Sequence, residues 1–385
     1  MNKWSKLDFN DWKKVKSLFP NVGSYLNLNS GSAGTMPIAV QKTLIENIGI
    51  LNNKPAYQAW NDWSELIQNT KNQIGQLLNV DPSGIVLNRN ATEGLNTIIQ
   101  NIKLTKEDEI ILASHDYPNV IKQFEFRAKK ENSSLSYLDI DLSKLSDAEI
   151  VQKYEKAISK KTKLIVLTHI THREGRVLPI TEITKIAHDK DVLVLVDGAH
   201  SFGHVDFDLQ NTSSDFFASS LHKWINAPLG TGFLYIKPGL EEHLDFPLNP
   251  NLPKKISNFE NIGTSAYFLW ATIEAALIFH NQLGIAKKEA RLNYLTNYWI
   301  SALDSNVEHT FAYYDKAQIK GICSIHFPNK NVSSLCSILR KKYQINTKLV
   351  RINQKTYLRV SSNTFTTETD LDHFVDKLQT VLKEI

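Results

Sequence analysis

Short apolar runs alternate along the chain with longer segments in which apolar residues recur every three or four positions. The short runs are typical of buried strands, and the longer segments are typical of amphipathic helices. The first part of the chain predicts strands at residues 83–87, 109–113, 135–138, 164–168, 192–196 and 232–236, and helices at 90–102, 117–130 and 180–190. Strands and helices that alternate in this way favour a mostly parallel sheet with helices on both faces.

The pattern changes after residue 265. The elements predicted beyond this point are helices at 266–283, 286–303, 332–343 and 369–385 and strands at 323–327 and 357–360. The chain is too long for one small core, so we expect an α/β fold in two parts. Residues 20–265 form the predicted large domain, which holds the mostly parallel sheet. Residues 1–19 and 266–385 form a smaller C-terminal α/β domain, and the helix at 266–283 bridges the two.

Composition and charge argue against several classes of protein. The 44 basic and 40 acidic side chains leave a net charge of +4 that is spread along the chain, so no nucleic-acid surface is expected. No apolar run is long enough to predict a membrane span, and residues 1–20 lack the apolar core of a signal peptide. Two cysteines, Cys323 and Cys336, can form neither a disulfide framework nor a zinc site by themselves. We therefore expect a cytoplasmic location and no bound metal.

Two residues carry the most specific chemical signal. Asp197 follows five apolar residues, which predicts a carboxylate at the carboxyl end of a buried parallel strand, where ligands bind in α/β sheets. Lys223 follows 26 positions later, within SSLHKW at residues 219–224. A lysine amine can form an imine with the aldehyde of pyridoxal phosphate, and a carboxylate can keep its ring nitrogen protonated. Each residue alone has an ordinary alternative, a capping aspartate or a solvated surface lysine.

A third motif, NATEG at residues 90–94, opens the predicted helix at 90–102. The unpaired N–H groups and the positive dipole end of a helix N-terminus suit a phosphate group. Thr92 can add a hydroxyl group to such a site. The alternative is a capped surface helix, because asparagine and threonine favour this position in any helix.

Together these motifs resemble those of fold-type I pyridoxal phosphate enzymes in the class V aminotransferase family. This family includes cysteine desulfurases, kynureninase and isopenicillin N epimerase. The similar segments are LVLVDGAH at 193–200, SSLHKW at 219–224, GTG at 230–232 and ATEG at 91–94. The resemblance covers residues 20–380. It implies the fold of type I pyridoxal phosphate transferases, pyridoxal 5'-phosphate as the cofactor and an amino acid as the substrate.

The resemblance also implies roles for individual residues around the cofactor. Lys223 would carry the cofactor as a Schiff base, Asp197 would contact its ring nitrogen, and His200 would lie close to the ring. The residues implied to bind the cofactor phosphate are Ala91, Thr92, Ser220 and His222. Tyr117 falls where the family places an aromatic residue or histidine that stacks on the ring, although loop aromatics often serve packing alone. His115 is a second candidate for the same role.

Other implied contacts concern the substrate. Arg359, in YLRVS at residues 357–361, resembles the arginine that binds the substrate carboxylate, because a guanidinium offers a planar fork that fits this group. A buried acid partner for this arginine is the alternative. Asn29 and Ser32 belong to NSGSAG at 29–34, which resembles a loop that lines the substrate pocket. The glycines of this loop are also compatible with a plain turn.

Two further positions bear on the cofactor. Thr264 resembles the residue that reaches the phosphate of the neighbouring subunit, which implies a homodimer with shared active sites. Thr171 or His172 occupies a place where many relatives have an asparagine near the phenolic oxygen of the cofactor, and Glu174 stands where a threonine is frequent. This departure leaves the electronic tuning of the ring, and therefore the type of reaction, open.

The absence of a suitably placed cysteine narrows the set of reactions that the sequence predicts. A persulfide-forming desulfurase needs a mobile cysteine shortly before the carboxylate-binding arginine, and the predicted loop at 345–356 contains none. The Asp-Gly-Ala-His motif at residues 197–200 most resembles the isopenicillin N epimerase-like subgroup of the family. We expect an enzyme that acts at Cα of an amino acid through an external aldimine, with epimerisation or racemisation ahead of β-elimination by a C–S lyase and of transamination.

Two alternatives from other classes are weaker. A nicotinamide dehydrogenase would need a glycine-rich turn between a strand and a helix, whereas GTG at 230–232 precedes a strand. A non-catalytic protein that binds pyridoxal phosphate is the least favoured hypothesis, because both Lys223 and Asp197 are present.

Overall fold

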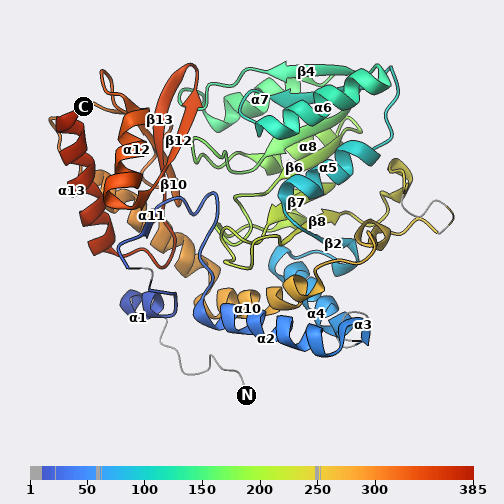
Figure 1. Cartoon of the computed structure of the whole chain (residues 1–385). Helices are drawn as coiled ribbons and strands as arrows, with labels where there is room; N and C mark the ends of the chain where they lie inside the picture. Colours follow the sequence, from blue (N-terminus) through green and yellow to red (C-terminus); the bar gives the residue numbers. More distant parts are fainter. Residues whose placement is uncertain (1–10, 22, 58–60, 62, 248–250, 252) are drawn as a thin grey trace.

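The structure is a computed structural model that describes residues 11–21, 23–57, 61, 63–247, 251 and 253–385. Its largest element is a seven-stranded sheet with the order β2-β8-β7-β6-β5-β3-β4 (Figure 1). The strands are β2 (Ile85–Asn88), β3 (Glu109–Ala113), β4 (Ser134–Leu138), β5 (Thr162–Thr168), β6 (Leu193–Asp197), β7 (Phe216–Ser220) and β8 (Gly232–Ile236). Within this sheet β8 runs antiparallel to its neighbours β2 and β7, and the other pairs are parallel. The expectation of a mostly parallel α/β sheet is confirmed.

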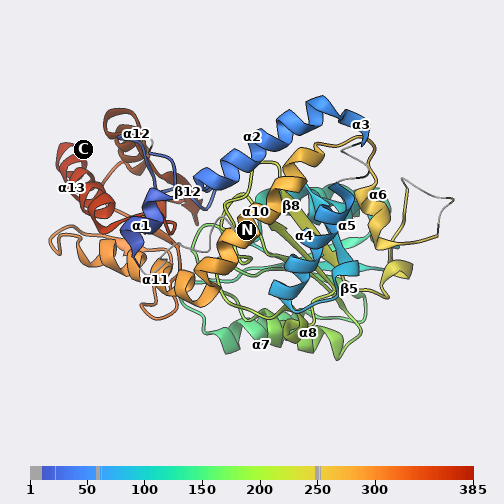
Figure 2. The same cartoon turned by 90° about the horizontal axis from the view of Figure 1, so that it is seen from below.

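Helices cover both faces of the sheet. One face packs against α5 (Ala91–Asn101) and α6 (Pro118–Glu131). The other face packs against α2 (Ile38–Asn53), α4 (Trp63–Leu78), α7 (Asp147–Ala157), α8 (Ile180–His188) and α10 (Tyr267–Leu283). Figure 2 shows α2, α4 and α10 together on the near side of the molecule. The short helix α3 (Pro55–Tyr57) follows α2, and α9 (Leu209–Thr212) lies between β6 and β7.

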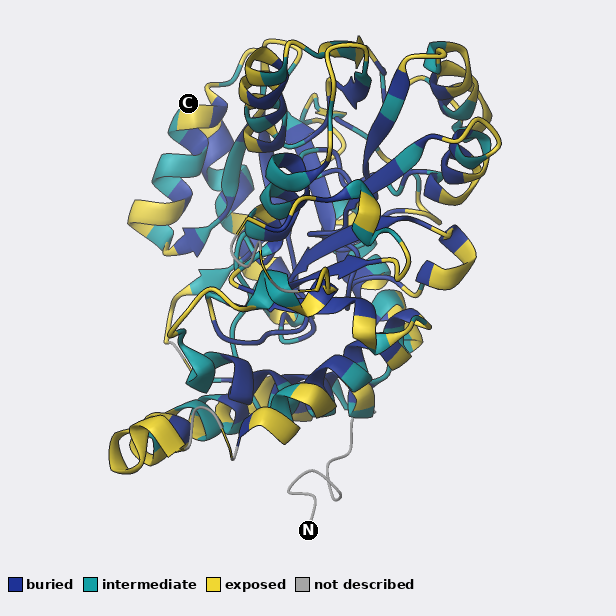
Figure 3. Cartoon of the chain, turned by 90° about the vertical axis from the view of Figure 1, so that its right-hand side faces the viewer, coloured by how far each residue is buried: buried dark blue, intermediate teal, exposed yellow. Residues whose placement is uncertain are grey.

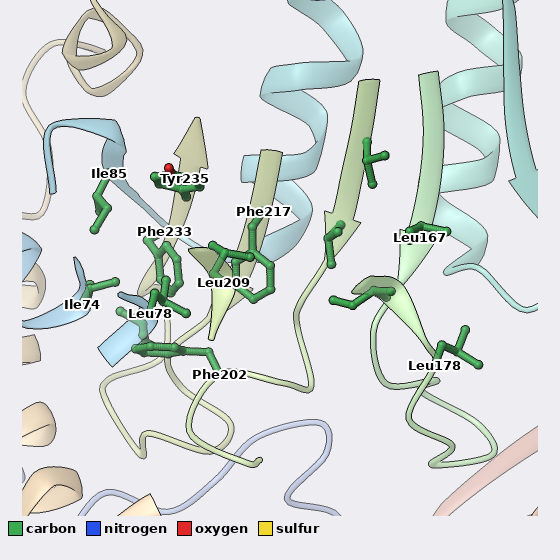
Figure 4. Packing of buried hydrophobic residues seen from close by; sticks show 14 of the residues in the cluster. Ile74, Leu78, Ile85, Leu167, Leu178, Phe202, Leu209, Phe217, Phe233 and Tyr235 are labelled. Atoms are coloured by element: carbon green, nitrogen blue, oxygen red, sulfur yellow. The ribbon is translucent and has the colours of Figure 1, made fainter. Parts of the chain in front are cut away.

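The two faces of each strand bury different side chains. On β7, Phe217 points into the cluster shared with α4 and α10, whereas Phe216 points into the cluster shared with α5 and α6. Figure 4 shows Phe217 beside Phe233, Leu209 and Phe202 in the first of these clusters. The strands at the centre of the sheet are buried on both faces, and exposed positions gather on the outer helices (Figure 3). This explains why the strands appear in the sequence as continuous apolar runs.

Local signals fix where several helices begin. The Asn90 side chain caps α5 by accepting a hydrogen bond from the Glu93 N–H group. Ser146 and Glu149 form a reciprocal capping box at the start of α7. Such caps satisfy N–H groups that have no partner inside the helix. The start of α5, which borders the largest cluster of candidate site residues, is therefore held in place by its own sequence.

The C-terminal part builds a second, smaller core. A four-stranded antiparallel sheet has the order β12-β13-β10-β9. Its strands are β9 (Thr310–Phe311), β10 (Ile322–His326), β12 (Lys348–Ile352) and β13 (Lys355–Ser361), and its helices are α11 (Ile285–Ser301), α12 (Val332–Tyr343) and α13 (Glu368–Glu384). In Figure 1 this unit, coloured orange to red, lies beside the large sheet.

The N-terminal segment joins this second unit. Helix α1 (Trp12–Ser17) packs near the C-terminal end of α10 through a small apolar cluster. Strand β1 (Leu26–Asn27) pairs with β11 (Ile345–Asn346), and Asn29 pairs with Ser361. Helix α10, in turn, shares the core of the large sheet. The division into two domains at residue 265 stays a prediction. Residues 1–10 of the predicted smaller domain lie outside the described part of the chain.

Some elements differ from the expectations. Helices α2, α4 and α7 and strand β7 were not expected, and the segment 345–356, expected to be a loop, holds β11 and β12. The hairpin between β12 and β13 turns at Asn353 and Gln354, which both have positive φ angles, 46° and 66°. Such turns usually contain glycine. Because neither residue is a glycine, the sequence carries no strong turn signal here.

The described residues show neither a membrane span nor a metal cluster. No helix in the described segments is long and apolar enough to cross a membrane. The same residues contain no group of three or more His, Cys, Asp or Glu side chains arranged to hold a metal ion. Both cysteines have free thiols; Cys323 is buried on β10 and Cys336 lies half-buried on α12.

The packing of β7 gives a test of the core. Phe217 is 0% exposed, whereas Phe126 on α6 is 64% exposed. We expect Phe217→Ala to destabilise the protein by about 3–5 kcal/mol, because the substitution leaves a cavity between β7 and its helix layer. Chemical denaturation followed by tryptophan fluorescence measures the effect. Phe126→Ala removes the same atoms from the surface, and equal shifts for the two variants would contradict this description of the core.

Candidate active site

A single cavity of about 470 Å³ lies where the carboxyl ends of β3, β5, β6 and β7 meet the start of α5. This is the edge at which open α/β sheets bind ligands. Strands β12 and β13 of the second unit contribute to its wall. The lining residues are Gly31, Ser32, Asn90, Ala91, Thr92, Leu95, Tyr117, Thr168, His172, Asp197, Ala199, His200, Ser220, His222, Lys223, Lys348 and Arg359.

Lys223 reaches the cavity from the loop that follows β7. Its Nζ lies 3.4 Å from Nε2 of His200, and Nδ1 of His200 lies 3.4 Å from the indole N–H of Trp224. Because the indole can only donate, Nδ1 accepts and the histidine proton sits on Nε2, facing the lysine. Burial is the main cause that lowers the pKa of Lys223 to about 8. This amine therefore loses its proton at a lower pH than an ordinary lysine does, although most of it still carries the proton at neutral pH.

Asp197 ends β6 and is buried at the base of the cavity. Its Oδ1 accepts a hydrogen bond of 2.9 Å from the N–H group of Ala199. Burial raises the pKa of this carboxyl, while the Ala199 hydrogen bond and the charge of Lys223 lower it. The turn after Asp197 packs tightly on β7, because a Cβ atom on Gly198 would lie 2.0 Å from the Phe217 ring. The carboxylate is thus fixed in place and has room for a cationic partner in the cavity.

The first turn of α5 lies against the loop that carries Lys223. The Ala91 N–H group donates to Oγ of Ser220 at 2.9 Å, and Thr92 lines the cavity beside it. The Nδ1 atom of His222 is buried and has no hydrogen-bond partner among the described residues. A helix N-terminus, two hydroxyl groups and an unpaired imidazole nitrogen form a cradle suited to a phosphate group.

These features fit pyridoxal phosphate. The cavity offers a lysine amine with a lowered pKa for its aldehyde, a buried carboxylate for its ring nitrogen and a phosphate cradle at α5. The volume also lies in the range of small-molecule sites. The unpaired Nδ1 of His222 and the buried charge of Asp197 are the two observations that most need a partner of this kind.

Tyr117 and His172 line the cavity from the loops after β3 and β5. Their rings meet edge to face, with centroids 5.3 Å apart. Burial is the main cause that holds the pKa of His172 well below its usual range, and the charges of Arg173, Arg359, Lys348 and Lys223 act in the same direction. His172 is therefore a neutral base. His115 lies outside the set of lining residues, and neither of its buried ring nitrogens has a hydrogen-bond partner among the described residues.

Arg359 brings a buried guanidinium from β13 into the cavity. It donates to the backbone oxygen of His172, to Oδ1 of Asn29 and to Oγ of Ser32, at 2.7, 2.8 and 3.1 Å. Its Nε is buried without an acceptor, and no described carboxylate forms an ion pair with it. The buried acid partner considered from the sequence is not found in the described part of the chain. A carboxylate ligand would supply the missing acceptor.

The N-terminal loop is locked against the lysine loop. The Gly34 N–H group donates to the backbone oxygen of His222 at 2.9 Å, and a Cβ atom on Gly34 would lie 2.3 Å from the backbone oxygen of Lys223. Glycine is required at this close approach. The loop that holds Asn29 and Ser32, which bind Arg359, is thereby fixed relative to Lys223.

The structure brings most of the proposed site residues together and leaves two apart. Asn29 contacts the cavity indirectly, through Arg359. Thr264 is exposed and lies outside the cavity of this single chain, so its contact with a neighbouring subunit stays a prediction. Thr168 and Lys348 line the cavity but were not among the expected site residues. Lys348 lies in the unpredicted strand β12, and its position opposite Arg359 is visible only once the hairpin is known.

The chain has relatives among characterised proteins. A sequence model of the family described as aminotransferase class-V matches residues 27–374. Isopenicillin N epimerase from Streptomyces clavuligerus is 25% identical over 398 residues, which cover 97% of this chain and 99% of that protein.

Solved structures share the fold. The cysteine desulfurase CsdA from Escherichia coli has a TM-score of 0.84 at 20% identity, over 97% of this chain and 99% of that chain. The cystine C-S lyase C-DES, solved with its product cysteine persulfide, has a TM-score of 0.82 at 22% identity, over 93% of this chain and 97% of that chain. At these identities the similarity establishes the fold and carries no statement about the reaction. The expected fold of type I pyridoxal phosphate transferases is confirmed.

The low pKa of Lys223 can be measured directly on the apoenzyme. The free amine is the reactive form, so competitive labelling of Lys223 with acetic anhydride should rise with pH about a midpoint near 8. Ordinary lysines titrate near pH 10.4 and supply an internal reference in the same peptide digest. A midpoint for Lys223 equal to that of the exposed lysines would show that burial does not lower the pKa of this amine and would contradict its role as a base.

Proposed function

Because the chain belongs to the class-V aminotransferase family, whose members are pyridoxal phosphate enzymes, we propose that it inverts the Cα centre of an amino acid. The bound cofactor supplies an electron sink that makes the Cα–H bond acidic. The protein must hold the substrate, take up the proton and return a proton on the other side. The activity proposed is therefore that of an epimerase or racemase.

Two side chains that can exchange a proton reach the same cavity, and they carry this proposal. Lys223 enters from the loop after β7, and His172 enters from the loop after β5. The pKa of Lys223 is lowered to about 8 and that of His172 is lowered well below its usual range, chiefly by burial. Inversion needs one group to remove the proton and a second group to deliver one. We assign one face of Cα to each group: the uncharged form of Lys223 removes the proton in one direction, neutral His172 removes it in the other, and each returns a proton that it has taken up.

The remaining residues position the substrate and the cofactor. Arg359, held by Asn29 and Ser32, is proposed to bind the α-carboxylate through the part of its guanidinium that lines the cavity. Tyr117 is proposed to pack against the cofactor ring. Asp197 is proposed to hold the ring nitrogen in its protonated form, because a buried carboxylate gains from a cationic partner.

The phosphate cradle is proposed to comprise five side chains or backbone groups. Its members are Ala91, Thr92, Ser220, His222 and, from a second subunit, Thr264. His200 is proposed to orient the Lys223 amine from its Nε2–H group, and its own position is set by Trp224.

The positions of the thiols argue against a persulfide-forming desulfurase. Cys323 is buried on β10, and burial raises the pKa of its thiol well above the usual range. Burial raises the pKa of Cys336 to about 11, and neither cysteine lines the cavity. A nucleophilic cysteine needs an exposed thiolate with a depressed pKa. Neither thiol meets this condition.

Two other reactions begin from the same lysine. β-Elimination, as in a C–S lyase, and transamination both start when Lys223 removes the Cα proton, and its uncharged amine supports them as well. They differ from inversion in their later steps, because neither requires His172 to return a proton to Cα. The product therefore separates the three reactions.

Proton exchange in deuterated water tests the proposed inversion. With the substrate amino acid, the holoenzyme should exchange Cα–H and convert one enantiomer into the other, as followed by NMR and chiral chromatography. Lys223→Ala should abolish both processes and alter the visible absorption of the bound cofactor. His172→Gln should slow inversion by about a hundredfold while exchange with retention persists, because general acid–base groups contribute on this scale.

The other products define the contrary outcomes. Release of an α-keto acid and ammonia from a β-substituted amino acid would establish elimination. Transfer of the amino group to an added keto acid would establish transamination. Either result, without inversion of any D- or L-amino acid, would overturn the epimerase proposal. Cofactor absorption that no amino acid changes would favour a non-catalytic protein.

The proposed homodimer has its own test. One chain has a mass of 43.8 kDa, so light scattering should give twice this value for the holoenzyme. If Thr264 reaches the partner's cofactor phosphate, Thr264→Val should weaken cofactor binding about tenfold, because a hydrogen bond to a charged group contributes about 1.5–3 kcal/mol. Thr310→Val, at an exposed position on β9, is the control. A monomeric holoenzyme with unchanged affinity in Thr264→Val would exclude the shared site.

A further inference from the structure

The cavity contains a second cation that the proposed function does not use. Lys348 begins β12, and its register partner on β13 is Arg359. Both side chains line the same cavity. Like charges placed directly opposite on neighbouring strands destabilise a sheet. Lys348 is half-buried, and an anion bound in the cavity would compensate the repulsion between the two cations.

No described residue supplies that anion. Lys348 has no hydrogen bond and no ion pair among the described residues, and Arg359 has no ion pair there. Other buried arginines do have such partners: Arg176 pairs with Asp147, and Arg291 pairs with Glu368. The pKa of Lys348 is lowered by burial and by the charge of Arg359, which shows that the two cations repel each other.

The charges of the residues that line the cavity also leave Lys348 without an acidic partner. Asp197 is the single carboxylate among the lining residues, and its charge raises the pKa of Lys223 against the effect of burial. The phosphate cradle lies at α5, and an α-carboxylate would complete Arg359. Arg359 already takes its neutral contacts from His172, Asn29 and Ser32, and its guanidinium can hold one carboxylate alone. Lys348 is then left without a counter-charge.

We propose that Lys348 binds a second carboxylate, carried by the side chain of the amino-acid substrate. This inference rests on the proposed function, since it takes Arg359 as the site of the α-carboxylate. The substrate class is thereby narrowed to amino acids with an acidic side chain. Lys348 acts as a specificity-determining residue: its charge selects the substrate, and the proton transfers at Cα are left to Lys223 and His172.

Equilibrium binding to the holoenzyme tests this proposal without any turnover. The probes are glutarate and adipate, compared with the monocarboxylates butanoate and pentanoate, and isothermal titration calorimetry measures their Kd values. We expect each dicarboxylate to bind about tenfold more tightly than the monocarboxylates, the size of effect that corresponds to about 1.4 kcal/mol. Equal affinities for the two classes in the wild-type protein would overturn the proposal, whatever the variants do.

Variants locate the effect. Lys348→Gln should remove the preference for dicarboxylates and leave monocarboxylate binding within about twofold, whereas Lys348→Arg should keep the preference, because the charge is retained. Lys355→Gln removes the same charge from an exposed position on the same hairpin and should change neither class. If Lys348→Gln weakens both classes alike, Lys348 shares the single α-carboxylate and the proposal is wrong.

The experiments distinguish a failure of the proposed role of Lys348 from a failure of the proposed inversion reaction. The cofactor absorption of wild type and Lys348→Gln is recorded before each titration and shows that the site is loaded. A loaded holoenzyme without preference for dicarboxylates overturns only the role of Lys348. A loaded holoenzyme with the preference, but with no inversion of acidic amino acids, overturns the proposed reaction and leaves the acidic substrate class standing.

Discussion

The buried charge of Asp197 is the constraint on which the site depends. An ionised carboxylate inside a protein costs several kcal/mol unless hydrogen bonds and a cation compensate it, and here the Ala199 N–H group and Lys223 do so. Asp197 and Lys223 meet because each follows a parallel strand, and β6 and β7 are neighbours in the sheet. The same burial lowers the pKa of Lys223 while it raises that of Asp197. Lys223 and Asp197 would hold pyridoxal phosphate, which would supply an aldehyde for the amine and a cationic ring nitrogen for the carboxylate.

The second unit contributes the part of the cavity that is proposed to face the substrate. Arg359 and Lys348 both come from its sheet, whereas Lys223 and Asp197 come from the large sheet. The N-terminal loop connects the two, because its residues 29 and 32 hold Arg359 while Gly34 lies against the lysine loop. A substrate carboxylate on Arg359 would thus be placed relative to Lys223 by backbone contacts and not by flexible side chains alone. This arrangement suits a reaction in which the direction of proton transfer matters.

The sequence predicted those parts of the structure that local chemistry determines. Asp197 follows a continuous apolar strand, and the start of α5 carries its own cap, so both could be placed from the residues alone. Strand β12 could not, because its hairpin turns at Asn353 and Gln354 without glycine. Lys348 was missed for the same reason: a lone lysine in a presumed loop has no visible partner until the strand register sets it opposite Arg359. Contacts of this kind depend on tertiary pairing, which local patterns do not encode.

Within the cavity, the residues that would activate Cα differ from those that would select the later steps. This separation explains how one fold can serve several reactions. Solved structures with this fold are named as a cysteine desulfurase and as a C-S lyase, and a sequence relative is named as an epimerase. A lysine, a carboxylate and a phosphate cradle suffice to activate Cα, and they do not decide which bond changes next. That decision falls to the groups around them: which side chains can carry a proton, whether a reactive thiol is present and which charges meet the substrate. In this chain the groups proposed for that decision are His172 on a loop and Lys348 on a strand, both outside the motifs that identify the family, and neither cysteine lines the cavity.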